Sequence, residues 1–166
     1  LRPFCDSDGK DLYGYLSREE VVRFEPYPVF SLEEANKEAE KRALDPAFVA
    51  VCLRDPEGPG KLIGNLWHAA DGAPDWRTWE IGYVFHSDFQ GKGYATEAVS
   101  RLLEYLFCSL GAERVTAMCD PQNVKSWRLL ERLGMRREGH LLHNVFFHRD
   151  DEGRPIWKDT YLYAIL

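Results

Sequence analysis

The chain has 166 residues, of which 45% are apolar and 29% charged, with a formal net charge of −6. This length suits one domain with a hydrophobic core, and no apolar run approaches the roughly 20 residues of a membrane-spanning helix. The acidic balance and the lack of a basic stripe argue against nucleic-acid binding and favour a cationic partner. Leu1 stands where Met is usual, so we expect a few N-terminal residues to be missing, and no signal-peptide pattern is visible.

Cysteine usage points to a reducing compartment. None of the four cysteines forms a C-x-x-C pair, and three lie in apolar segments: Cys5, Cys52, Cys108 and Cys119. The sequence therefore predicts reduced thiols in the core of a cytoplasmic protein, and no spacing supports a catalytic cysteine.

Two capping-box patterns predict helix starts near the N-terminus. Ser17 is followed three residues later by Glu20, and Ser31 by Glu34. The second helix is expected to run to about Leu44, with one apolar face made of Leu32, Ala35, Ala39 and Ala43.

The next segments alternate between strand and helix patterns. Residues 48–55 and 62–69 predict a hairpin with a turn at 56–61, and 79–86 a third strand. A helix over 94–110 ends at Gly111, and its predicted buried stripe is Ala95, Ala98, Val99, Leu102, Leu103, Leu106 and Leu110.

The remaining elements complete a mixed sheet. A strand at 114–120 precedes a short helix that Asn123 can cap and Gly134 can end, and two strands follow at about 140–149 and 156–166. Because a helix links them, strands 79–86 and 114–120 are predicted to be parallel neighbours. The fold class is α/β (α+β), a single domain over 1–166 with a mostly antiparallel twisted sheet flanked by helices.

The segment 84-VFHSDFQGKGYATEA-98 predicts a strand, a glycine loop and a helix start, a geometry that gathers backbone N–H groups around an anion. A nucleoside-triphosphate loop is excluded because Gly93, not Ser or Thr, follows Lys92. A dinucleotide site remains a weak alternative. Thr96 replaces its third glycine, four residues separate strand from loop, and few residues follow Asp120.

A third interpretation is a pyrophosphate loop for coenzyme A. Residues 90–95 (QGKGYA) fit the pattern [Q/R]-x-x-G-x-[G/A], and three motifs occur in order around it: 80–83 (EIGY), Asn123-x-x-Ser126 and 130–135 (LERLGM). Together with the opening 1–4 (LRPF), they make the chain resemble the GNAT superfamily of N-acetyltransferases along nearly its whole length. The nearest resemblance is to the RimJ/RimL-type branch, which acts on protein N-termini.

The resemblance implies a GNAT-type sheet and direct transfer of acetyl from acetyl-CoA to an amine. Glycine admits close approach of phosphate oxygens and positive φ, and the helix dipole favours an anion. The residues expected to bind the coenzyme, partly through their backbone, are Val84, Phe85, Gln90, Gly91, Lys92, Gly93, Tyr94, Ala95, Thr96, Asn123 and Ser126.

Two residues are candidates for the chemistry. Glu80 is the candidate base, since aromatic neighbours can raise the pKa of its carboxyl, and it alternatively lies exposed without a role. Ser126 matches the family position that faces the leaving sulfur, as an acid or only as a hydrogen-bond donor. Asn123 serves the coenzyme arm, the helix cap, or both.

Other features carry less weight. A metal site at His140, His143 and His148 is not expected, because no compact ligand set accompanies them. Four aromatic residues line an acceptor pocket or pack in the core: Trp67, Trp76, Trp79 and Tyr83. The acceptor stays open among protein N-termini, aminoglycosides, polyamines and amino acids, with loops 23–31 and 68–78 expected to shape its pocket. A coenzyme-binding module without catalysis is a further alternative, and a homodimer is expected by family analogy only.

Overall fold

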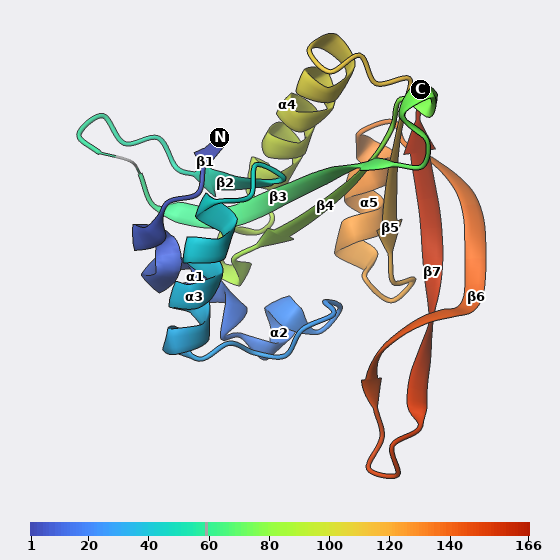
Figure 1. Cartoon of the computed structure of the whole chain (residues 1–166), viewed down its shortest axis with the longest axis horizontal. Helices are drawn as coiled ribbons and strands as arrows, with labels where there is room; N and C mark the ends of the chain where they lie inside the picture. Colours follow the sequence, from blue (N-terminus) through green and yellow to red (C-terminus); the bar gives the residue numbers. More distant parts are fainter. Residues whose placement is uncertain (59) are drawn as a thin grey trace.

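The computed structural model describes residues 1–58 and 60–166, and Figure 1 shows one twisted sheet with helices on both faces. The helices are α1 (Gly9–Leu16), α2 (Glu19–Val22), α3 (Leu32–Ala43), α4 (Tyr94–Cys108) and α5 (Val124–Arg132), with short 3-10 turns at Asp6–Asp8, Pro74–Trp76 and Ser87–Phe89. The strands are β1 (Arg2–Pro3), β2 (Phe48–Cys52), β3 (Leu62–Asp71), β4 (Thr78–Phe85), β5 (Arg114–Cys119), β6 (Arg136–Arg149) and β7 (Pro155–Ile165).

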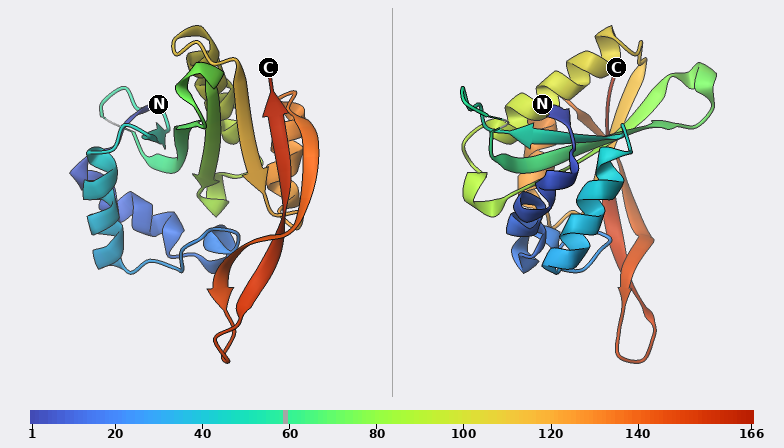
Figure 2. Two further views of the ribbon diagram at one scale, coloured as in Figure 1. Left: turned by 45° about the vertical axis from the view of Figure 1, so that its right-hand side comes forward. Right: turned by 60° about the vertical axis from the view of Figure 1, so that its left-hand side comes forward.

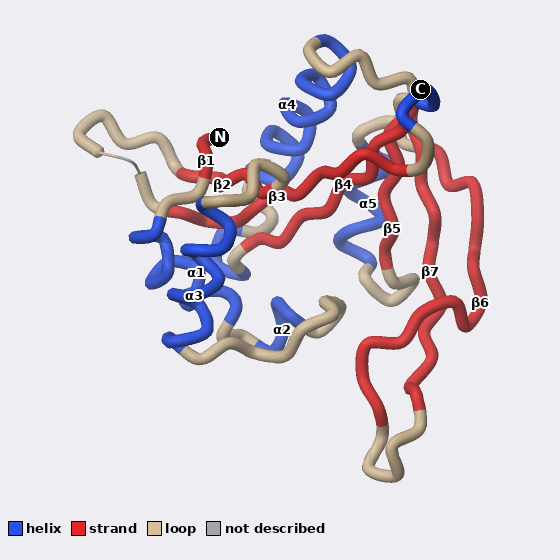
Figure 3. Tube along the Cα trace, viewed as in Figure 1, coloured by secondary structure: helices blue, strands red, loops and turns tan. Residues whose placement is uncertain are grey.

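The seven strands form one sheet in the order β1-β2-β3-β4-β5-β7-β6. Every neighbouring pair is antiparallel except β4 and β5, which are parallel as predicted. The crossover through α4 imposes this direction, because a parallel pair needs a long connection. Figure 3 shows the strands crossing the molecule from the N-terminal edge to the β6–β7 hairpin.

The helices divide between the two faces of the sheet (Figure 2). Helices α1, α2 and α3 bury Leu12, Tyr15 and other apolar side chains against Phe4, Ala50, Leu62 and Val84. Helices α4 and α5 bury a larger cluster against the other face, which includes Ile81 and Phe85 of β4. Because side chains alternate along a strand, the even-numbered residues of β4 face the side of α1–α3 and the odd-numbered ones face α4 and α5.

The second capping box is present as predicted, and the first is not. The Ser31 hydroxyl accepts the Glu34 N–H, and the Glu34 carboxylate accepts the Ser31 N–H. Ser17 instead follows α1, which the sequence did not predict, and its hydroxyl donates to the Tyr13 carbonyl. Arg18 is the residue that precedes α2.

Several predicted boundaries and burials differ from the structure. Helix α4 ends at Cys108, so Leu110 lies beyond it and is 36% exposed instead of completing the stripe. Leu32 at the first turn of α3 is also exposed. All four cysteines are free, but only Cys119 is buried, so the predicted core environment is wrong for the two exposed ones, Cys5 before the first 3-10 turn and Cys108 at the end of α4. Strand β6 begins at Arg136, earlier than predicted.

Two hairpins lie in the sheet on either side of β4 and β5. Strands β6 and β7 form a long hairpin that extends past the sheet (Figure 1), with irregular pairing at three places. The β2–β3 hairpin is present as predicted, although Pro59 in its turn lies outside the described residues. Among the residues described, no helix has the length and apolar character needed to cross a bilayer.

Candidate active site

The glycine loop has the backbone geometry that the sequence predicted. Gly91 and Gly93 have φ of 74° and 87°, a region that residues with a Cβ rarely adopt. A Cβ added to either glycine would meet no atom within 4 Å. The glycines are therefore required by backbone conformation, and the space in front of them is open to a ligand.

A row of backbone N–H groups faces this space. The Gln90 N–H donates to the Ser87 carbonyl, and the Glu97 N–H donates to the Gly93 carbonyl. Between them, the amides from Gly91 to Thr96 donate to no acceptor in the described chain. Unpaired amides at the N-terminus of a 15-residue helix form a site for a phosphate group.

Basic side chains surround the same loop. The ammonium groups of Lys92 and Lys61 lie 5.2 Å and 5.5 Å from the centre of the Phe89 ring, and an Arg132 N–H donates to the Thr96 hydroxyl at 3.3 Å. The sequence identified Lys92 but missed Lys61 and Arg132, which come from distant segments. Their charges favour an anion with more than one phosphate.

Gln90 has a structural role in the loop. Its side-chain NH₂ donates to the Phe85 carbonyl at 3.1 Å, and its oxygen accepts from the Lys125 ammonium at 2.8 Å. This side chain thus ties the end of β4 to the first turn of α5. Val84 and Phe85 bury their side chains on opposite faces, so only their backbone groups are available to a ligand.

Strands β4 and β5 diverge next to the loop. Their ladder ends at the pair Ile81–Ala117, although β4 continues to Phe85 and β5 to Cys119. The backbone groups of β4 that point toward β5 after Ile81 therefore have no ladder partner. An extended ligand arm can bind there by adding its own amides to the strand.

Ser126 and Tyr83 meet across this opening. Their hydroxyl oxygens are 2.9 Å apart, and Ser126 lies in the first turn of α5 because Asn123 caps that helix by accepting its N–H at 3.2 Å. Burial raises the pKa of the Tyr83 phenol, which therefore stays protonated. Burial also raises the pKa of the nearby Cys119 thiol to about 11, so this thiol is not a nucleophile at neutral pH. The sequence nominated Ser126 and did not predict its phenolic partner.

Glu80 lies on the opposite face of β4 from Tyr83. It is half-buried and pairs with Ala69 of β3 and Thr116 of β5, next to the point where β4 and β5 separate. Burial raises the pKa of its carboxyl, and the charge of Asp71 raises it further. The carboxyl therefore faces the side of α1–α3, while the two hydroxyls face α5.

Glu25 is a second carboxylate that the sequence did not predict. It lies in the loop after α2, where its N–H donates to the Val22 carbonyl at 2.8 Å. Burial raises the pKa of its carboxyl to about 7, although Tyr27 and Arg42 lower it, and its charge in turn raises the pKa of Tyr83. The sequence indicated only that loop 23–31 shapes the acceptor pocket.

The aromatic and histidine candidates do not converge. Trp67 pairs with Gly82 on the face of Glu80, whereas Trp79 packs on the other face and Trp76 is 66% exposed in a surface turn. His140 pairs with Asp159 at 3.3 Å on the β6–β7 hairpin. Within residues 1–58 and 60–166, no three His, Cys, Asp or Glu side chains are grouped to hold a metal ion.

An anion cradle beside two diverging strands, with hydroxyls on one face of β4 and the Glu80 carboxyl on the other, is an arrangement suited to acyl transfer from a phosphate-bearing carrier. The model of the acetyltransferase (GNAT) domain matches residues 1–136. The chain belongs to this family, whose members transfer the acetyl group of acetyl-CoA, and it is an N-acetyltransferase.

Known proteins resemble the chain over most or all of its length. It is 37% identical to the uncharacterized N-acetyltransferase YnaD of Bacillus subtilis, over 100% of this chain and 92% of YnaD. A solved GNAT-family acetyltransferase from Bacillus anthracis superposes with a TM-score of 0.85 at 32% identity, over 99% of this chain and 92% of that one. Spermidine N(1)-acetyltransferase of Escherichia coli is 27% identical over 89% of this chain and 78% of its own length.

Proposed function

We propose that the enzyme acetylates a small cationic amine, with the coenzyme's pyrophosphate on the amides of Gly91–Thr96. The observation that carries the coenzyme assignment is the run of amides without acceptors at the start of α4. The residues nominated for the coenzyme fit this role in two groups. Residues 90–96 serve the phosphates, while the backbone of Val84 and Phe85, together with Asn123 and Ser126, serves the arm that leads to the thioester.

Glu80 is proposed to take the proton from the incoming ammonium, directly or through a water. Its raised pKa brings the carboxyl closer to the working pH of a base, and it faces the side of α1–α3, from which the amine is proposed to approach. The reaction converts an ammonium and a thioester into an amide and a thiol, with release of one proton. The nitrogen loses two protons in all: Glu80 takes one, which is the proton released to solvent, and the other ends on the sulfur of the thiol.

Ser126 and Tyr83 are proposed to assist the leaving thiolate from the opposite side. Their hydroxyls are 2.9 Å apart, so either one can donate to the sulfur while the other supports it. This arrangement separates base and acid across the gap between β4 and β5. The Tyr83 phenol joins the proposal because of its contact with Ser126, since its sequence position alone did not suggest this role.

A cationic acceptor is favoured over a neutral or acidic one. Glu80 faces the side of α1–α3, the charge of Asp71 acts on it from the end of β3, Glu25 is a further half-buried carboxyl after α2, and the net charge is −6. A relative that is 27% identical acts on spermidine, so a polyamine is the first acceptor to test.

Four properties remain predictions: membership of the RimJ/RimL-type branch, a cytoplasmic location, a single domain over 1–166 and a homodimer.

The coenzyme assignment is tested with two glycine variants. Gly93→Ala and Gly111→Ala each place a Cβ at a positive φ in open space, at opposite ends of α4. Both variants should lose similar stability, on the order of 1 kcal/mol, because the strain is alike. Only Gly93→Ala should lose coenzyme A binding, measured by the rise in melting temperature with ligand. Equal binding by the two variants, or wild-type stabilisation by NAD instead of coenzyme A, would reject the site.

The acceptor class is tested by turnover. Acetyl-CoA consumption should be fastest with spermidine, slower with an aminoglycoside, and slowest with an alanine-terminated peptide of net negative charge. Preference for the acidic peptide would reject the cationic acceptor and favour the protein N-terminus.

A further inference from the structure

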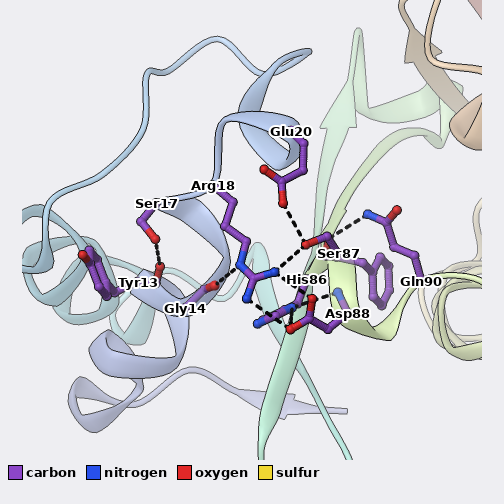
Figure 4. A network of polar contacts seen from close by, with 10 residues as sticks. Tyr13, Gly14, Ser17, Arg18, Glu20, His86, Ser87, Asp88 and Gln90 are labelled. Carbon is purple, nitrogen blue, oxygen red and sulfur yellow. Dashed lines mark hydrogen bonds and ion pairs between the residues drawn. The ribbon is translucent and has the colours of Figure 1, made fainter.

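Arg18 connects the helices on one face of the sheet to the loop that precedes the anion cradle. It lies between α1 and α2, and its guanidinium donates to the Asp88 carboxylate through two nitrogens, at 2.7 Å and 3.1 Å (Figure 4). The same group donates to the Ser87 hydroxyl at 2.8 Å and to the Gly14 carbonyl at 3.0 Å. A planar guanidinium held by partners on both elements fixes their relative position.

Two further hydrogen bonds hold the same turn, Ser87–Phe89. The Ser87 hydroxyl donates to the Glu20 carboxylate of α2 at 3.1 Å, and the Asp88 N–H donates to His86 Nδ1 at 3.2 Å. Burial and the nearby Arg18 charge lower the pKa of His86, so its imidazole stays neutral and can accept. The turn Ser87–Phe89 is therefore held by α1 and α2 at its start, and by the Gln90–Lys125 contact at its end.

The two elements that Arg18 joins face different substrates in the proposed function. Ser87 and Asp88 lie just before the amides of Gly91–Thr96. Helix α2 has only four residues and leads into the irregular loop that carries Glu25. A short helix followed by a loop has low local stability, so its order depends on the contacts that hold it.

We propose that Arg18 is a positioning residue that transmits coenzyme binding to residues 19–31. A ligand on Gly91–Thr96 restrains the Ser87–Phe89 turn, and the bidentate contact with Asp88 extends that restraint to α2 and the Glu25 loop. By reciprocity, an acceptor that orders the Glu25 loop raises coenzyme affinity. This inference rests on the proposed coenzyme site.

Hydrogen exchange with and without saturating coenzyme A tests the inference on the full chain. In the wild type, coenzyme A should slow exchange of residues 87–97 about tenfold or more and that of residues 19–31 about threefold. Arg18→Ala should keep the first effect at saturating ligand and lose the second. Asp88→Asn breaks the same ion pair from the loop side and should act alike, which covers the case that Arg18→Ala does not fold.

A matched control removes another exposed ion pair, on the helix that begins at the same site. Arg101→Ala breaks the Arg101–Glu104 pair on the outer face of α4, and both protections should persist. Protection of 87–97 without protection of 19–31 in the wild type would overturn the role of Arg18, as would unchanged protection of 19–31 in Arg18→Ala. Absence of any protection at 87–97 would instead reject the coenzyme site itself.

Discussion

Replacing Glu25 by Gln is expected to stabilise the fold above neutral pH while impairing acceptor binding. Burial raises the pKa of this carboxyl from 4.5 to about 7. A carboxyl with a higher pKa in the folded than in the unfolded state binds its proton more tightly in the folded protein. The free energy of unfolding is therefore greatest below the unfolded pKa and falls as pH rises from about 4.5 through about 7. Glutamine does not ionise, so the free energy of unfolding of the variant does not fall over this pH range as that of the wild type does.

The size of the effect follows from that pKa difference. At about 1.4 kcal/mol for each pH unit, the span from 4.5 to about 7 gives an upper bound of roughly 3.5 kcal/mol. The side chain is partly exposed, and Tyr27 and Arg42 remain near it, so about 2 kcal/mol is expected. For a chain of this length, that corresponds to a melting temperature about 4 to 8 °C higher at pH 8.5 and nearly unchanged at pH 4.5.

Thermal unfolding at both pH values measures this, with Glu40→Gln on the exposed face of α3 as the control. Steady-state kinetics with spermidine at pH 8 should give an acceptor KM for Glu25→Gln at least about tenfold higher, because an ionised Glu25 pairs with the cation. A stability gain that is equal at the two pH values would refute the burial argument. An unchanged acceptor KM would remove Glu25 from the site.

Three further variants or pairs test the site. Gly93→Val should weaken coenzyme A binding by about 50-fold or more, and Lys92→Ala by less than about fivefold, because the exposed lysine adds only a screened charge. Calorimetry measures both affinities, and equal losses would contradict binding by the backbone amides. Glu80→Gln should lower kcat about 100-fold and leave coenzyme affinity unchanged. The loss in kcat should shrink as pH rises, because more of the amine then arrives deprotonated. Near-normal turnover at pH 7 would end the assignment of Glu80 as the base. Ser126→Ala and Tyr83→Phe should each lower kcat about tenfold, because the remaining hydroxyl can replace the lost one. The double variant should lower kcat clearly more. If its kcat is no lower than that of either single variant, neither hydroxyl assists the sulfur.

Local patterns predicted the elements that depend on few neighbouring residues. The Ser31 cap, the Asn123 cap and the positive φ of Gly111 each arise within about four residues, so the sequence contains their full cause. The buried stripe of α4 follows from the 3.6-residue period, and the parallel β4–β5 pair follows from the length of the crossover. The wrong prediction at Ser17 also has a local cause. Its hydroxyl donates to the Tyr13 carbonyl in the last turns of α1, so it does not cap the following helix as the pattern predicted.

By itself, then, the sequence determined the glycine cradle, the helix behind it and two of the residues proposed for the chemistry. The tertiary structure decided how those parts meet. Strand alternation requires that Glu80 and Tyr83 face opposite sides, but only the packing of α4 and α5 decides which side holds each one. The Tyr83–Ser126 contact spans 43 residues of chain and the Arg18–Asp88 contact 70, and the charge of Glu25, in a loop with no periodic signal, raises the pKa of Tyr83. Contacts between such distant residues depend on how helices and strands dock against a shared core, and no local window of sequence carries that information.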